Sequence, residues 1–267
     1  RTNTLNRPAI CALDIQTGCM ACITGAIDNL CTAHAVKRSQ QENNCLGPFG
    51  ALPILMQDDL DVSIVIPIYN NASILPATIE KLQSYFSRTR LRYDLIFVND
   101  ASTDASLSII ETAAQTITNI KLLNLAMNGG QQRALMQGFM VAGGKVVIAV
   151  DADLPCEMTD LMRLAQMANE GVELVLGKRT GDIRRTWLRR LGSKIGNLLF
   201  RLLFEFQIQD FGCGIGAIRR QLIERLRSHG VPARLIKLDL LFLAESYVEV
   251  DVNTTNTISQ NRSSYSF

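Results

Sequence analysis

Two aspartates stand one residue apart at the end of an apolar run. The segment KVVIAVDADLPCE covers residues 145–157, and its acidic pair is Asp151 and Asp153. In an extended chain alternate side chains point to the same face, so both carboxylates can aim at one point beyond a strand. Two like charges there favour a cation between them, and carboxylate oxygens suit Mg²⁺ or Mn²⁺ carrying substrate phosphates. The alternative is a turn in which the aspartates only form local hydrogen bonds.

Three further polar segments follow apolar runs in the same way. They are PIYNN, NDAS and NGGQ, which begin at Pro67, Asn99 and Asn128. One such cluster fits an ordinary turn, but four at successive strand ends describe a polar rim around a single cleft. A nicotinamide-binding domain would carry G-x-G-x-x-G after its first strand, where this chain has PIYNNAS, so the pattern counts against a dehydrogenase.

The elements that would position this rim alternate between strand and helix patterns. Strands are predicted at residues 62–68, 93–100, 120–126, 145–150 and 173–178. Helices are predicted from Ser73, after a cap at Asp104, and over residues 131–141 and 158–169. Strands that alternate with helices indicate an α/β fold, a doubly wound and mainly parallel sheet with helices on both faces. Ligands of such a sheet bind beyond the carboxyl ends of its strands.

Composition and charge narrow the class of protein. The chain has 267 residues, 47% of them hydrophobic, and a formal net charge of +2. This is enough apolar sequence for a substantial core, and so small a net charge does not favour a nucleic-acid partner. No run of eighteen apolar residues occurs, and the first ten residues lack the layout of a signal peptide, so neither a membrane span nor an export signal is predicted.

The first 57 residues differ from the rest of the chain. They hold five of the seven cysteines, Cys11, Cys19, Cys22, Cys31 and Cys45. One interpretation is a small metal or iron–sulfur site built on Cys19 and Cys22, and the other is an extension with free thiols, because the spacings match no zinc pattern. The Gly- and Pro-containing segment CLGPFGALPILMQDD then predicts a boundary, with a cysteine-rich extension over residues 1–57 and the main domain over 58–267.

Positive charge gathers in residues 178–201. This stretch holds eight basic residues against one acidic residue, and its apolar residues recur at helical spacing around Trp187. An amphipathic helix with basic flanks suits the surface of an anionic membrane. An ordinary surface helix packed on the sheet is the alternative, and Gly192 and Gly196 would weaken a free-standing helix.

Five segments in order resemble the family 2 glycosyltransferases of the GT-A fold. They are SIVIPIYNNASILPATIEKL, VNDASTDAS, NGGQQRALMQGF, VVIAVDADL and QDFGCGIGAIRR. The likeness covers about residues 60–267 and is strongest to the polyprenyl-phosphate sugar transferases, such as the undecaprenyl-phosphate aminoarabinose transferases and the dolichol-phosphate mannose synthases. It implies an inverting, metal-assisted transfer of a sugar from a nucleoside diphosphate sugar, with a UDP-sugar favoured, to a polyprenyl phosphate. It also implies work at the cytoplasmic face of a membrane, and the terminal NRSSYSF resembles a segment that precedes membrane helices in relatives.

The same resemblance implies roles for single residues on the donor side. Pro67, Tyr69 and Asp100 would hold the base and ribose of the nucleotide, and Asn128 and Gln131 would line the same pocket. The donor diphosphate and its Mg²⁺ or Mn²⁺ would be held by the two carboxylates of the DAD segment, Asp151 and Asp153.

On the acceptor side the resemblance points to Asp210 of QDFGC, as a base or an orienting group near the sugar. Asp153 and Asp210 are the expected catalytic residues. The acceptor phosphate would be bound by Arg179, Arg189 and Ser193. An acceptor phosphate is already an anion, so positioning matters more than base catalysis.

The chain departs from the family pattern at three places. Asn71 stands where relatives usually have an acidic residue, Pro155 replaces a Gln that helps to bind metal, and Gly216 replaces an Arg. Proline has no ligating side chain and glycine has no charge for a phosphate. Two alternatives therefore stay open: a soluble family 2 enzyme with a saccharide or protein acceptor, and an inactive copy that serves as a nucleotide- or membrane-binding scaffold. The sugar and the oligomeric state, a homo-oligomer included, are also open.

Overall fold

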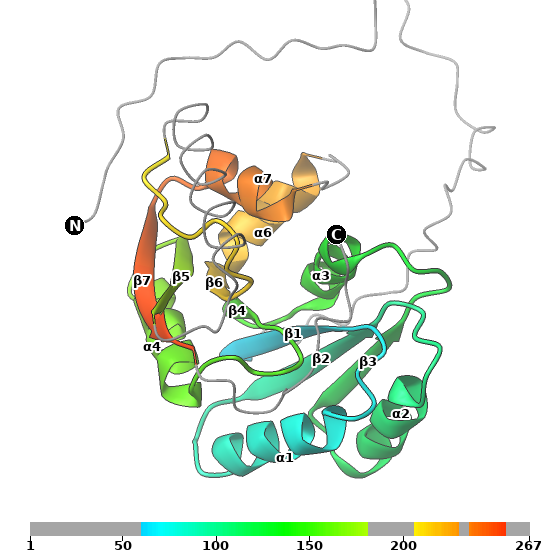
Figure 1. Ribbon diagram of the computed structural model, residues 1–267. Helices are drawn as coiled ribbons and strands as arrows, with labels where there is room; N and C mark the ends of the chain where they lie inside the picture. Colours follow the sequence, from blue (N-terminus) through cyan, green and yellow to red (C-terminus); the bar gives the residue numbers. More distant parts are fainter. Residues whose placement is uncertain (1–59, 181–205, 230–234, 255–267) are drawn as a thin grey trace, which may run out of the picture. The chain divides into compact units, whose positions relative to one another are not determined.

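A single mixed sheet organises the described part of the chain. The computed structural model describes residues 60–180, 206–229 and 235–254. Their seven strands form one sheet in the order β3-β2-β1-β4-β6-β5-β7 (Figure 1). The strands are β1 Val62–Ile68, β2 Tyr93–Asn99, β3 Ile120–Asn124, β4 Val146–Ala149, β5 Leu174–Thr180, β6 Gly216–Arg219 and β7 Tyr247–Asn253. Only β6 runs against its neighbours, β4 and β5, so the sheet is mainly parallel, as predicted.

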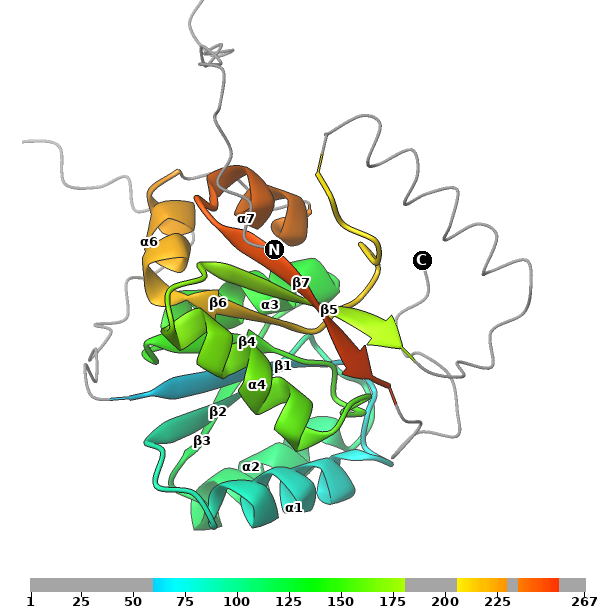
Figure 2. The same cartoon turned by 90° about the vertical axis from the view of Figure 1, so that its left-hand side faces the viewer.

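Helices cover both faces of this sheet, which confirms the predicted doubly wound architecture (Figure 2). The described helices are α1 Leu75–Phe86, α2 Ser106–Thr116, α3 Gln131–Val141, α4 Met158–Asn169, α6 Arg220–Ser228 and α7 Ile236–Leu243. The first core cluster joins α1, α2 and α4 to one face, and the second joins α3, α6 and α7 to the other. A strand between two such layers must be apolar on both sides, which is why β1 is buried along its whole length.

The predicted element bounds need small corrections. The helices at residues 131–141 and 158–169 have the predicted limits, but α1 begins at Leu75 and not at Ser73. The N–H groups of Ile74 and Leu75 both donate to the carbonyl of Asn71, so residues 71–74 form a turn before the helix. The second, third and fourth strands are one or two residues shorter than predicted, and β5 extends to Thr180.

The reversed strand β6 decides what lies near the end of β4. Ala149 at the carboxyl end of β4 pairs with Gly216 at the amino end of β6, and Leu176 of β5 pairs with the same glycine. Because β6 is antiparallel, the segment that precedes it arrives at the sheet edge where β4 and β5 end. Residues 210–215 therefore lie beside the residues that follow β4.

Within the described ranges, no helix is long and apolar enough to cross a membrane. The cysteine-rich extension and most of the basic stretch at residues 178–201 lie outside the described residues, so the boundary at residue 57 and the amphipathic helix stay predictions.

Candidate active site

The structure places Asp151 and Asp153 in a tight turn beyond the end of β4. The N–H of Leu154 donates to the carbonyl of Asp151 at 3.0 Å, and Leu154 has a positive φ of 43°. The buried hydroxyl of Thr78 on α1 lies 2.6 Å from the carbonyl of Ala152 and donates to it. The turn is thus held both by its own backbone and by a helix on the first face of the sheet.

Asp151 is partly buried, and the charged groups around it shift its pKa in opposite directions. Burial and the negative charge of Asp153 raise the pKa of Asp151 to about 6, while the positive charges of Arg179 and Lys237 act in the opposite direction. Gln131, the first residue of α3, donates from Nε2 to Oδ1 of Asp151 at 2.5 Å. The two aspartates therefore repel each other at close range, which is the condition that a bound cation relieves.

The donor set of this turn fits a hard divalent cation that also binds substrate. In the described residues, no group of three or more His, Cys, Asp or Glu side chains is placed to hold a metal. A pair of carboxylates leaves coordination positions for other oxygens, and Mg²⁺ in such sites takes them from phosphates and water. Asp151 and Asp153 would hold the cation, and Gln131 would orient the first of them.

The turn after β1 is fastened to the turn after β2. Asn70, which has a positive φ of 52°, accepts a hydrogen bond from the N–H of Thr103 at 2.8 Å and donates its own N–H to Ser102. The side chain of Asn71 accepts from the N–H of Tyr69 at 2.9 Å. Asn71, which replaces the usual acidic residue, thus stabilises the turn that presents Tyr69, while Pro67 is buried within β1.

Asp100 holds the turn that starts α3. It is fully buried, and its two oxygens accept hydrogen bonds from the N–H groups of Gly129 and Gly130, each at 2.8 Å. Gly130 has a φ of 82°, a conformation that glycine adopts without steric cost, and the exposed Asn128 also accepts from its N–H. Asp100 thereby sets where Gln131 begins the helix. Its contact with a nucleotide stays a prediction, as do those of Pro67, Tyr69 and Asn128.

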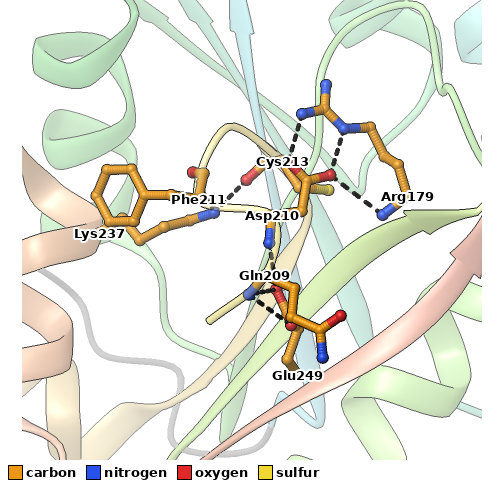
Figure 3. Close-up of polar contacts among 7 residues, drawn as sticks. All are labelled: Arg179, Gln209, Asp210, Phe211, Cys213, Lys237 and Glu249. Atoms are coloured by element: carbon orange, nitrogen blue, oxygen red, sulfur yellow. Dashed lines mark hydrogen bonds and ion pairs between the residues drawn. The ribbon is translucent and has the colours of Figure 1, made fainter. Parts of the chain in front are cut away.

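Arg179 at the end of β5 forms a two-pronged ion pair with Asp210. Its Nε and Nη2 atoms lie 2.6 Å from the two carboxylate oxygens, and its backbone N–H donates to the same group at 3.2 Å (Figure 3). Burial alone would raise the pKa of Asp210, but the hydrogen bonds and charge of Arg179 bring it below its ordinary value. Asp210 is therefore a weak base that stays ionised near neutral pH and fixes the guanidinium.

Glu249 of β7 supports this pair from below. Its carboxylate accepts hydrogen bonds from the N–H groups of Gln209 and Asp210, the latter at 2.7 Å (Figure 3). Glu249 was not among the predicted site residues, although the alternating pattern of YVEVDVN indicates a strand with Glu249 on its polar face.

Two glycines bring the ion pair and the acidic turn together. A Cβ atom on Gly214 would lie 3.0 Å from Oδ2 of Asp151, and one on Gly212 would lie 3.1 Å from Nη2 of Arg179. The backbone of the DFGCG segment, residues 210–214, therefore runs against both charged groups. The structure thus gathers Gln131, Asp151, Arg179 and Asp210 at one sheet edge, whereas Arg189 and Ser193 lie outside the described residues.

Comparison with solved structures shows the fold. A mannosyltransferase from Pyrobaculum calidifontis, determined with GDP-Man and Mn²⁺, aligns with a TM-score of 0.53 at 16% identity, covering 79% of this chain and 61% of that one. Glucosyl-3-phosphoglycerate synthase from Mycobacterium tuberculosis, determined with phosphoglyceric acid, aligns with a TM-score of 0.52 at 16% identity, covering 76% and 73%. At this identity the likeness is one of architecture, and it confirms the expected GT-A fold.

Sequence comparison shows the family. An undecaprenyl-phosphate 4-deoxy-4-formamido-L-arabinose transferase from Proteus mirabilis is 32% identical over 192 residues, which are 72% of this chain and 59% of the relative. A transferase of the same name from Serratia proteamaculans is 34% identical over 166 residues, 62% of this chain and 51% of the relative, so the chain spans between half and three fifths of these relatives. The model of glycosyl transferase family 2 matches residues 63–227. With that match over more than half of its length, the chain belongs to glycosyl transferase family 2.

Proposed function

We propose that this chain is the catalytic domain of an inverting glycosyltransferase that moves a sugar from a nucleoside diphosphate sugar to a polyprenyl phosphate. The observation that carries the proposal is the meeting of two charged groups at one sheet edge. Asp151 with Gln131 suits the donor diphosphate, and the Arg179–Asp210 pair, joined to it by the DFGCG segment, suits an anionic acceptor. The names of relatives at about a third identity support a polyprenyl phosphate as the acceptor.

The donor half of the site handles the leaving diphosphate. A divalent cation, Mg²⁺ or Mn²⁺, would offset the negative charge that develops there as the sugar–phosphate bond breaks. Asp151 and Asp153 would hold that cation, and Gln131 keeps one of the two carboxylates in place through its hydrogen bond. The turns after β1 and β3, which present Tyr69 and Asn128, form the side on which the base and ribose are proposed to lie. A UDP-sugar is the favoured donor.

The acceptor half positions an anion and requires little proton transfer. An arginine carries more N–H groups than one carboxylate uses, so Arg179 can bind Asp210 and a phosphate together. The lowered pKa of Asp210 argues for an orienting role and against a general base. Arg189 and Ser193 are proposed to complete the phosphate site, and the basic stretch around them is proposed to bring the domain to the cytoplasmic surface of an anionic membrane.

The departures from the family pattern favour a second candidate, a scaffold that binds nucleotide without turnover. Pro155 supplies no ligand, and Gly216 is packed in β6 so that a Cβ atom would lie 3.2 Å from the carbonyl of Val175. An arginine side chain at residue 216 would therefore require the strands to move apart. With Gly216, this chain has no positive charge at the position where relatives have an Arg.

A transfer assay separates these candidates. The purified chain would be incubated with UDP- or GDP-sugars and undecaprenyl phosphate in anionic liposomes, with and without Mn²⁺, and the lipid extracted for labelled sugar. We expect Mn²⁺-dependent labelling that Asp153→Ala removes. Labelling of a saccharide or protein acceptor without lipid would instead support the soluble enzyme. Nucleotide binding without transfer to any acceptor would support the scaffold.

A further inference from the structure

A lysine from another element contacts the middle of the DFGCG segment. Lys237, on α7, donates from Nζ to the carbonyl of Phe211 at 2.9 Å and also to the carbonyl of Cys213 (Figure 3). The same Nζ lies 5.4 Å from the centre of the Phe211 ring. All three contacts fall within the five residues that link the ion pair to the acidic turn.

This lysine is unusual in its helix. The sequence of α7 is IKLDLLFL, and Ile236, Leu240 and Leu241 pack into the core. Burial lowers the pKa of Lys237, so the ammonium form carries a desolvation cost, which the two carbonyls and the aromatic ring offset. A helix that served only to cover the sheet would be more stable with an apolar side chain here, because burying a charge is costly even when it is paired.

The held segment touches the site at both of its ends. Asp210 at one end accepts from Arg179, and the Cβ position of Gly214 at the other end is 3.0 Å from Asp151. Between them the N–H of Cys213 donates to the carbonyl of Asp210 at 3.2 Å, which closes the segment into a turn. A shift of this turn would therefore move the ion pair and the backing of Asp151 together.

We propose that Lys237 is a positioning residue of the active site. It fixes the DFGCG segment so that Asp210 aligns Arg179 toward the acceptor and Gly214 supports Asp151. The inference rests on the proposed function for its effect on catalysis, but its effect on the segment can be measured without any substrate.

The test compares Lys237→Met with a matched control, Arg227→Met. Arg227 on α6 likewise donates to two backbone carbonyls, those of Phe139 and Met140 near the end of α3, but it does not contact the DFGCG segment. Assays run at a temperature where both variants are folded. We expect Lys237→Met to lower kcat by about 10–100-fold, a common effect of losing a group that orients a ligand. We expect Arg227→Met to change kcat by less than about twofold, within ordinary distant-site variation.

Amide hydrogen exchange supplies the second measurement. Lys237→Met should speed exchange at the amides of Asp210 and Cys213, and Arg227→Met should leave them unchanged. If Lys237→Met does not fold, Lys237→Gln replaces it. This variant keeps one donor group, so we expect a smaller loss of kcat and a smaller increase in amide exchange. Unchanged exchange at both amides overturns the positioning role. Faster exchange in Lys237→Met together with an equal loss of kcat in both variants also overturns it. If Lys237→Met speeds exchange but the unchanged chain has no transferase activity, only the proposed function is overturned.

Discussion

At the scale of single residues, the site stores electrostatic repulsion that a ligand would remove. Asp151 has a pKa raised from 3.8 to about 6 by burial and by Asp153. A carboxyl group whose folded pKa is raised binds its proton more tightly in the folded state. Its unfavourable contribution is therefore absent below the ordinary pKa, grows as the pH rises, and is complete above the folded pKa. Asp151 should therefore destabilise the metal-free domain at neutral pH.

We therefore expect Asp151→Asn to stabilise the metal-free domain at about pH 7.5. The gain in the free energy of unfolding should be about 1–3 kcal/mol, since each unit of pKa shift corresponds to roughly 1.4 kcal/mol. Urea unfolding without metal at about pH 7.5 and pH 4 measures it, and the gain should shrink at the lower pH. A gain of equal size at both pH values would show that Asp151 is not strained. The same variant should lose its stabilisation by Mn²⁺ with nucleotide.

Asp210 should behave in the opposite way. Its folded pKa is lowered, so its stabilising contribution is present above the ordinary pKa of 3.8 and is lost as the pH falls through the folded value. Asp210→Asn leaves Arg179 partly buried without its counter-ion and should cost about 2–3 kcal/mol at neutral pH. Glu224→Gln breaks an exposed pair with Arg220 and should cost less than about 0.5 kcal/mol. Equal losses in urea unfolding would contradict the special strength of the Arg179–Asp210 pair.

At the scale of elements, local patterns predicted much of the frame and less of the site. The helices at residues 131–141 and 158–169 have strong apolar periodicity, and their limits were predicted correctly. β6 has only four residues, too few for a clear pattern, and the alternation in β7 indicates a strand without showing that it joins this sheet beside β5. Lys237 could not be predicted because its partners lie 24 and 26 residues away and only the reversal of β6 brings them near.

The DFGCG segment lies so close to Asp151 that a substitution at Gly214 should impair ligand binding without lowering stability. Gly214→Ala should weaken Mn²⁺-dependent nucleotide binding by about tenfold or more, because its Cβ would press on the Asp151 carboxylate, while the free energy of unfolding changes little. Gly138→Ala places a Cβ 2.2 Å from Val65 in the core and should cost about 1–3 kcal/mol of stability. Its nucleotide affinity should stay unchanged. Calorimetric titration and urea unfolding of both variants check the pair, and parallel losses would refute the assignment of Gly214 to the site.

At the scale of the whole molecule, ligand binding should appear as added stability. A ligand present at a hundred times its dissociation constant stabilises the folded state by about 2.7 kcal/mol. We expect thermal unfolding with UDP and Mn²⁺ to shift upward, GDP to give a smaller shift, and Asp153→Ala to remove the cation-dependent part. If nucleotide raises the unfolding temperature by the same amount with and without Mn²⁺, the acidic turn holds no metal in spite of its two carboxylates.

The reversed strand has a consequence for how the two halves of the site hold together. Four residue pairs join β4 to β6, and this ladder connects the half of the sheet that leads into the turn of Asp151 and Asp153 to the half that carries Arg179 and Glu249. The helices strengthen this seam, because the N–H of Asn253 on β7 donates to Asp160 of α4 and Arg227 of α6 donates to the carbonyl of Phe139 on α3. We therefore expect the two halves of the site to unfold together in one cooperative transition, and not one after the other.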